Sequence, residues 1–120
     1  MSWLFQTDLP IYTQLVARLQ QQIVSGGYPP GSKLPSVREL AAEAGVNPNT
    51  VQRAFAELER LGLIYTQRTA GKFVTEDAAA IGAARRALAE GQTRQYLAAM
   101  RALGCTREET IAYLDQMEEQ

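Results

Sequence analysis

The sequence predicts a mainly α-helical fold with one small β-hairpin, followed by a short helical segment at the C-terminus. Three stretches before Gly62 place apolar side chains at helical spacing, and two short strand-like runs later flank a polar turn. After Thr75 the composition becomes rich in alanine, which favours further helix. We therefore expect two parts, residues 1–75 and residues 76–120.

The first helix is predicted to follow Asp8-Leu9-Pro10. Asp8 is a candidate cap, and Pro10 suits the opening turn, where its missing N–H would have no intrahelical partner. Arg18 is expected to lie in solvent. The buried face consists of apolar residues at helical spacing: Tyr12, Leu15, Val16, Leu19 and Ile23.

The second and third helices are predicted to be joined by a very short turn. The second opens with the capping box Ser36-Val37-Arg38-Glu39, and Gly45 suits the left-handed residue that ends it. Asn47 as N-cap and Pro48 at the first helical position begin the third helix. This spacing indicates a helix-turn-helix. The third helix runs to about Leu61, with an apolar stripe of Val51, Ala54, Phe55, Leu58 and Leu61.

A hairpin is predicted directly after the third helix. The strand-like runs 63–67 and 72–74 flank Arg68-Thr69-Ala70-Gly71, a typical turn. A hairpin in this position is called a wing. Residues 33–74 therefore predict a winged helix-turn-helix.

The C-terminal segment predicts two more helices. Residues 77–100 favour one long helix, weakened at Gly82 and with a candidate break at residues 91–93. Thr106-Arg107-Glu108-Glu109 is a second capping box, so a last helix should run from Arg107 to about Met117. Its apolar residues Ile111, Ala112 and Leu114 cannot all be buried against a single neighbouring helix.

Composition excludes several classes of protein. The chain has no histidine and a single cysteine, Cys105, so we expect no internal disulfide, no histidine-dependent catalytic site, no ordinary zinc site and no cofactor. No apolar run approaches the roughly 20 residues that cross a bilayer, and the first residues lack the pattern of a signal peptide. We therefore expect a cytoplasmic protein with no membrane contact and no enzymatic activity.

Charge is distributed unevenly along the chain. Residues 1–75 contain seven Lys or Arg and five Asp or Glu, a net charge of +2, whereas residues 76–120 contain five and eight, a net charge of −3. The total of −1 hides this asymmetry. Because phosphate contacts depend on where charge is placed, the first part is compatible with nucleic-acid binding.

Three spaced motifs point to a known family. They are Pro-Ile-Tyr-Thr-Gln-Leu at residues 10–15, Gly-Ser-Lys-Leu-Pro-Ser-Val-Arg-Glu-Leu-Ala at 31–41 and Gly-Val-Asn-Pro-Asn-Thr-Val-Gln-Arg-Ala at 45–54. Together they resemble the DNA-binding domain of the GntR family of bacterial regulators, over roughly residues 9–74. The remainder resembles the small YtrA-type branch, in which two C-terminal helices serve dimerisation.

The resemblance implies a homodimeric regulator, most simply a repressor, that binds double-stranded DNA at a GT…AC-type palindrome. It implies a DNA-facing set of Arg38, Asn47, Asn49, Thr50, Gln52 and Arg53, with Arg68, Thr69, Gly71 and Lys72 added by the wing. One departure concerns the wing. The family usually has Gly directly after the basic residue, whereas Thr69 and Ala70 precede Gly71 here. How deeply this wing enters the minor groove is left open.

Physical arguments divide the work among these residues. Arg53 suits a bidentate contact to guanine, and Asn49 or Gln52 suits adenine, because an α-helix fits the major groove. Ser36 and Thr50 lie near helix N-termini, which favour phosphate oxygens, while Arg38 suits either a phosphate or a base. Lys33, Arg68 and Lys72 would add attraction that does not depend on sequence.

Other interpretations compete with this one. Asn47 caps a helix in any protein, Arg60 suits an ordinary solvated face, and the wing residues suit a solvated hairpin tip. The winged fold is also compatible with a protein-binding adaptor whose acidic tail is the partner surface. An unidentified small-molecule effector is compatible with the family, but no residue marks its pocket.

Overall fold

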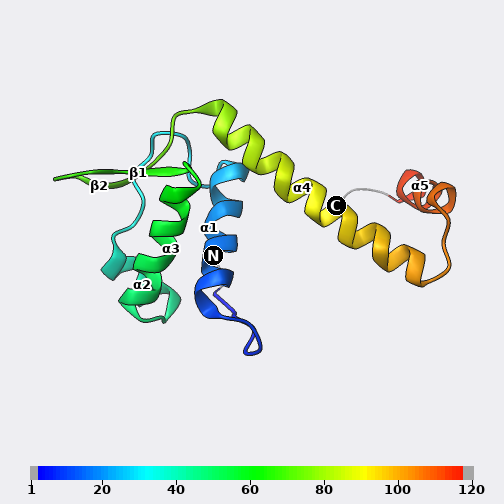
Figure 1. Ribbon diagram of the computed structural model, residues 1–120, viewed down its shortest axis with the longest axis horizontal. Helices are drawn as coiled ribbons and strands as arrows, with labels where there is room; N and C mark the ends of the chain where they lie inside the picture. Colours follow the sequence, from blue (N-terminus) through cyan, green and yellow to red (C-terminus); the bar gives the residue numbers. More distant parts are fainter. Residues whose placement is uncertain (1–2, 118–120) are drawn as a thin grey trace. The chain divides into compact units, whose positions relative to one another are not determined.

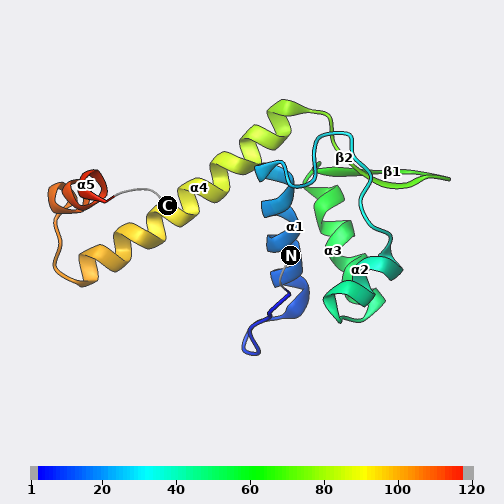
Figure 2. The same ribbon diagram turned by 180° about the vertical axis from the view of Figure 1, so that it is seen from behind.

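The computed structural model describes residues 3–117 and confirms the predicted fold class. Five helices and a two-stranded hairpin are found in this range (Figure 1), and Figure 2 gives the opposite view. Their bounds are α1 Ile11–Ser25, α2 Val37–Ala44, α3 Pro48–Arg60, β1 Ile64–Gln67, β2 Gly71–Val74, α4 Ala78–Ala102 and α5 Arg107–Gln116. The chain forms two compact units, one up to Arg85 and one from Arg86 onward.

The first unit is built around one apolar core. Both views show α1 and α3 side by side, and α2 packs against α3 (Figures 1 and 2). Ile81 and Ala84 of α4 are partly buried against this core, so the unit extends beyond the hairpin. Its largest fully buried side chains are Phe55, Leu15, Leu19, Ile23, Leu40, Leu58, Leu63, Val51 and Val74. The core fixes the orientation of α3, and with it the polar side of that helix.

The helix-turn-helix is formed by local capping signals. The Ser36 hydroxyl accepts a hydrogen bond from the Glu39 amide at 3.1 Å, and the Glu39 carboxylate accepts one from the Ser36 amide at 3.0 Å. Gly45 takes the left-handed conformation with φ 71°, and its amide donates to the Ala41 carbonyl. These predicted caps are confirmed, and only two residues lie between Gly45 and the first residue of α3, Pro48.

The hairpin pairs Ile64 with Val74 and Gln67 with Gly71 in antiparallel register. A third segment, which the sequence did not predict, joins the edge of β2. The Leu34 amide donates to the Lys72 carbonyl, and the Val74 amide donates to the Ser32 carbonyl, both at 2.9 Å. The loop before α2 is therefore hydrogen-bonded to the wing, which limits the freedom of both.

Several local expectations were wrong. Asp8 does not cap α1, because the helix begins only after Pro10, which occupies the N-cap position without a side-chain cap. Arg18 is half-buried rather than fully solvated, with its guanidinium 5.7 Å from the Trp3 ring centroid. Leu61 is 40% exposed because it lies in the turn after α3 rather than in its apolar stripe.

The second unit contains the end of α4 and α5. The candidate break at residues 91–93 does not occur, and α4 is continuous there, with the Thr93 hydroxyl donating to the Ala89 carbonyl one turn earlier. The second capping box is confirmed at Thr106 and Glu109. Thr110 is the only buried residue of this unit among residues 86–117. Within residues 3–117, none of the helices combines the length and the apolar character needed to cross a bilayer.

Candidate nucleic-acid interface

The start of α3 presents small polar residues on an ordered helix end. The Asn47 side-chain oxygen accepts a hydrogen bond from the Asn49 amide at 2.8 Å, and Pro48 occupies the first turn. Asn47 and Asn49 are exposed, while Thr50 is half-buried. The capping function of Asn47 therefore leaves its side-chain nitrogen as a donor without a protein partner in the described residues. A helix end of this kind can approach a groove closely.

Gln52 and Arg53 are both exposed on α3 but have different neighbours in the fold. Gln52 lines a hollow that it shares with Val37 of α2 and Lys72 of the wing. The Arg53 guanidinium carbon lies 3.9 Å from the centroid of the Tyr12 ring in α1. Both side chains are exposed, so the structure brings them together with Asn49 on the solvent side of one helix.

Two carboxylates on α3 are each bound by a cation. Glu57 accepts hydrogen bonds from the Nε of Arg60, at 3.0 Å for the nearer oxygen, and forms an ion pair with it. Glu59 forms an ion pair with Lys72 and accepts a hydrogen bond from the Thr66 hydroxyl at 2.8 Å. The hydrogen bond from Arg60 lowers the pKa of Glu57, and that from Lys72 lowers the pKa of Glu59. Neither carboxylate is therefore an isolated negative charge beside the polar side of α3.

Lys72 consequently lies in a different environment from the one that the sequence suggested. Its Nζ donates to Glu59 and also to the Thr66 hydroxyl, at 2.6 Å for the latter, and its side chain is 28% exposed. These bonds attach the wing to α3. The cation that was expected to attract phosphate is thus largely compensated within the protein.

The tip of the wing is exposed and carries one cation without a protein partner. Arg68 and Thr69 are exposed, and Arg68 forms no ion pair with any of the residues from 3 to 117. The turn closes with a hydrogen bond from the Ala70 amide to the Gln67 carbonyl. Gly71 has φ 111°, and a Cβ there would lie 3.3 Å from the Lys33 side chain. The left-handed residue is therefore at Gly71, so Thr69 and Ala70 need no unusual conformation.

The N-terminus of α2 adds a polar edge. Ser36 and Arg38 are exposed, and Arg38 forms no ion pair within the described part of the chain. Hydrogen bonding from the Ser36 backbone amide lowers the pKa of Glu39, so this carboxylate stays ionised and committed to the cap. The Ser36 oxygen accepts the Glu39 amide, which leaves its O–H as a donor to a further acceptor.

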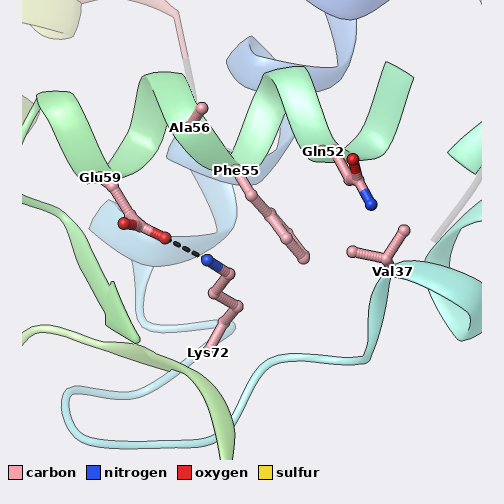
Figure 3. A pocket seen from close by; sticks show the side chains of 6 residues that line it. All are labelled: Val37, Gln52, Phe55, Ala56, Glu59 and Lys72. Carbon is pink, nitrogen blue, oxygen red and sulfur yellow. Dashed lines mark hydrogen bonds and ion pairs between the residues drawn. The ribbon is translucent and has the colours of Figure 1, made fainter. Parts of the chain in front are cut away.

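A hollow of about 360 Å³ lies between α2, α3 and the wing. Figure 3 shows Gln52 pointing toward Val37 and, on the other side of Phe55, the Lys72 side chain reaching Glu59. Phe55 forms the apolar base, and Ala56 lies on the neighbouring turn of α3. Because the exposed Gln52 lines the hollow, the hollow adjoins the polar side of α3.

Sequence reasoning missed three residues that organise this surface. Tyr12 was expected only to pack in the core, yet the Arg53 guanidinium also stacks on its ring. Glu59 and Arg60 were assigned no function, yet each holds a charged partner. The spacing of Glu57 and Arg60 could have signalled their ion pair, because residues three apart are neighbours on a helix. No sequence signal indicates the pairs that join different elements.

The comparisons with known proteins agree with this geometry. The family model described as "Bacterial regulatory proteins, gntR family" matches residues 11–74, which run from α1 to the end of β2. The chain belongs to the GntR family. It is therefore a transcriptional regulator with a DNA-binding domain, and the family consists of regulators rather than enzymes.

Two relatives of this GntR-family chain come from Bacillus subtilis strain 168. The uncharacterized HTH-type transcriptional regulator YhcF is 39% identical over 107 residues, covering 89% of this chain and 88% of YhcF. The HTH-type transcriptional repressor YtrA is 45% identical over 73 residues, covering 61% of this chain and 56% of YtrA. The similarity to YhcF thus extends beyond the DNA-binding domain.

Two solved structures add the fold and a DNA complex. A GntR family transcriptional regulator from Listeria monocytogenes has a TM-score of 0.88 and 43% identity, covering 95% of this chain and 100% of that one. The DNA-binding domain of AraR in complex with operator ORX1 has a TM-score of 0.58 and 31% identity, covering 62% of this GntR-family chain and 96% of that domain. A domain of this fold therefore binds operator DNA in a relative.

Proposed function

We propose that the chain is a homodimeric repressor that binds a palindromic operator through α3 and the wing. The observation that carries this proposal is the polar surface at the start of α3. Asn49, Gln52 and Arg53 are exposed there, while the nearby carboxylates of Glu57 and Glu59 are each paired with a cation. A helix start whose neighbouring carboxylates on α3 are each paired with a cation suits the negatively charged major groove.

Base reading is assigned to three side chains. Arg53 donates two hydrogen bonds to a guanine edge, and Asn49 or Gln52 pairs with adenine. Each good bidentate contact discriminates against a wrong base by about 1–3 kcal/mol. The relation to AraR supports DNA binding by this domain, since the AraR domain is described in complex with operators.

Phosphate contacts are assigned to the helix ends and the wing. Ser36, Asn47 and Thr50 donate from helix N-termini, and Arg38 adds a charge one turn into α2. At the wing, Arg68 and Thr69 reach the DNA while Gly71 closes the turn. Lys72 acts mainly by holding the wing on Glu59, because its charge is already paired.

Dimerisation is assigned to residues 76–120, and DNA binding to residues 1–75. Within α5, Ile111 is 46% exposed, Tyr113 50% and Leu114 57%. Exposed apolar side chains of this kind are typical of an interface between proteins, and a second copy of the chain would cover them symmetrically. Two copies double the DNA site and make it palindromic. The repressor role rests on the relative YtrA, which is named a repressor.

A selection experiment tests the proposal. The full chain is used to enrich duplexes from a random DNA pool at physiological salt, and the enriched sequence is measured by fluorescence anisotropy. We expect an inverted repeat that binds at least 10³-fold more tightly than random DNA. Arg53→Ala should remove preference at one base pair in each half-site, while Arg101→Ala, an exposed arginine in the second unit, should leave every preference unchanged. Failure to enrich any sequence would contradict the proposal.

A further inference from the structure

Arg53 is held in place by a residue of another helix. Its guanidinium carbon lies 3.9 Å from the centroid of the Tyr12 ring, and Tyr12 is partly buried against the core. An arginine stacked on an aromatic ring loses rotational freedom, but the N–H groups at its edge stay available to an acceptor. The Tyr12 ring therefore restricts the guanidinium of Arg53, although the Arg53 side chain is exposed.

Arg53 also has a natural competitor for its charge. Glu57 lies four residues further along α3, which is the spacing at which opposite charges pair on a helix. Instead, Glu57 accepts hydrogen bonds from Arg60, at 3.2 Å and 3.0 Å from Nε to the two carboxylate oxygens. No ion pair joins Glu57 to Arg53 in residues 3–117. Arg60 thus binds the carboxylate that is spaced on α3 to pair with Arg53.

We propose that Tyr12 and Arg60 are positioning residues for base recognition by Arg53. Tyr12 holds the guanidinium on its ring, and Arg60 retains Glu57, so that Arg53 meets the base edge already oriented and unpaired. Orientation before binding lowers the ordering cost of the contact. This inference rests on the proposed role of Arg53 as a base reader. It gives α1 a share in sequence specificity without contact to DNA.

The first arm of the test concerns the ring. The probes are the duplex selected by the full chain and duplexes changed at single base pairs, and Arg53→Ala identifies the pair that Arg53 reads. Tyr12→Leu should lower the preference at this pair by about two- to fivefold, the range expected for an exposed cation–π contact. Tyr12→Phe keeps the ring and should keep the preference. Tyr28→Leu is the matched control, because Tyr28 is also partly buried against the core but has no cation over its ring among the described residues.

The second arm concerns the carboxylate. Arg60→Gln releases Glu57 to pair with Arg53 and should lower the preference at the same base pair by about twofold, as expected for a helical ion pair. Adding Glu57→Gln to Arg60→Gln removes the competitor and should restore the preference. A loss of general phosphate attraction by Arg60→Gln would instead weaken binding to all duplexes equally, and the second substitution would change all of them equally too.

The outcomes separate the inference from the function on which it rests. If Arg53→Ala changes no base preference, the base-reading role of Arg53 is wrong. If Arg53→Ala removes a preference that Tyr12→Leu and Arg60→Gln leave intact, the positioning role is overturned and the proposed function stands. Thermal melting of each variant identifies loss of folding. Should Tyr12→Leu not fold, Tyr12→Met retains an apolar side chain without the ring and takes its place.

Discussion

The two units of the chain differ in what they bury. The first unit surrounds a core of apolar side chains from α1, α2, α3 and the hairpin, whereas the second buries only Thr110 among residues 86–117. The second unit is nevertheless not short of apolar residues, because Leu103 and Met117 are 77% and 72% exposed. The first unit therefore has its stabilising contacts within one chain, whereas the second has an apolar surface suited to a partner.

The largest effect is expected from a substitution in α5, where the second unit exposes apolar side chains. Leu114→Glu places a charge on the exposed apolar face and should convert a dimer to a monomer, with operator affinity reduced by about 100-fold because one half-site is lost. Sedimentation velocity and anisotropy measure the two effects. Gln21→Glu adds the same charge at an exposed position of α1 in the first unit, outside the proposed interface, and should leave the dimer intact. A Leu114→Glu chain that remains dimeric would remove α5 from the interface.

A smaller effect is expected from the two capping boxes, which are nearly identical in geometry. Ser36→Ala and Thr106→Ala should each weaken their helix by about 1 kcal/mol. The loss at Ser36 should lower the melting temperature of the first unit, because Leu40 and Ala41 of α2 belong to its core. The loss at Thr106 should show as faster amide exchange confined to α5. Ser36→Asp and Thr106→Asp keep an oxygen acceptor and serve as controls; equal melting shifts for both alanine variants would contradict this distinction.

The smallest effect concerns the ion pair between Glu59 and Lys72. The hydrogen bond from Lys72 lowers the pKa of Glu59 in the folded chain below its ordinary value of 4.5. The pair therefore stabilises the fold at pH values above 4.5. This stability is lost as the pH falls through the lower, folded pKa. At pH 7, Glu59→Gln should destabilise the first unit by about 0.2–1 kcal/mol, as exposed pairs typically do. Urea unfolding at a series of pH values should show the difference from the unchanged chain disappearing in acid.

The matched control for this pair lies in the second unit. Arg86 and Glu90 are joined at 3.1 Å, but their side chains are 83% and 51% exposed, compared with 28% and 35% for Lys72 and Glu59. Glu90→Gln should therefore change stability less than Glu59→Gln at every pH. A larger effect at Glu90 would show that exposure does not rank these pairs.

Local signals made most of the fold predictable. The capping boxes at Ser36 and Thr106, the left-handed Gly45 and the Asn47-Pro48 start each depend on neighbouring residues alone, and the structure confirms them. The prediction of Asp8 as a cap was wrong because Asp8 lies two residues before Pro10, the N-cap of α1. The prediction that Leu61 belongs to the apolar stripe was wrong because α3 ends at Arg60, and the helical periodicity does not continue beyond it.

The candidate interface was less predictable because its organising contacts are not local. The exposure of Asn49, Gln52 and Arg53 follows from the periodicity of α3, and the structure agrees with it. The ring of Tyr12 under Arg53 and the bridge between Lys33 and Phe73 join residues that are far apart in the chain. A sequence pattern does not specify which distant side chains meet. The assigned DNA contacts themselves stay a prediction until binding is measured.

The contact of Lys72 with Glu59 has a consequence for engineering. Thr66, Lys72 and Glu59 form one hydrogen-bonded group that spans the hairpin and α3. A hairpin grafted from a relative would carry its own residues at positions 66 and 72 and would dock only if they still match Glu59. We therefore expect that the wing and α3 can be exchanged together, whereas a chimera that changes only one of them keeps this hydrogen-bonded group only where the new residues match.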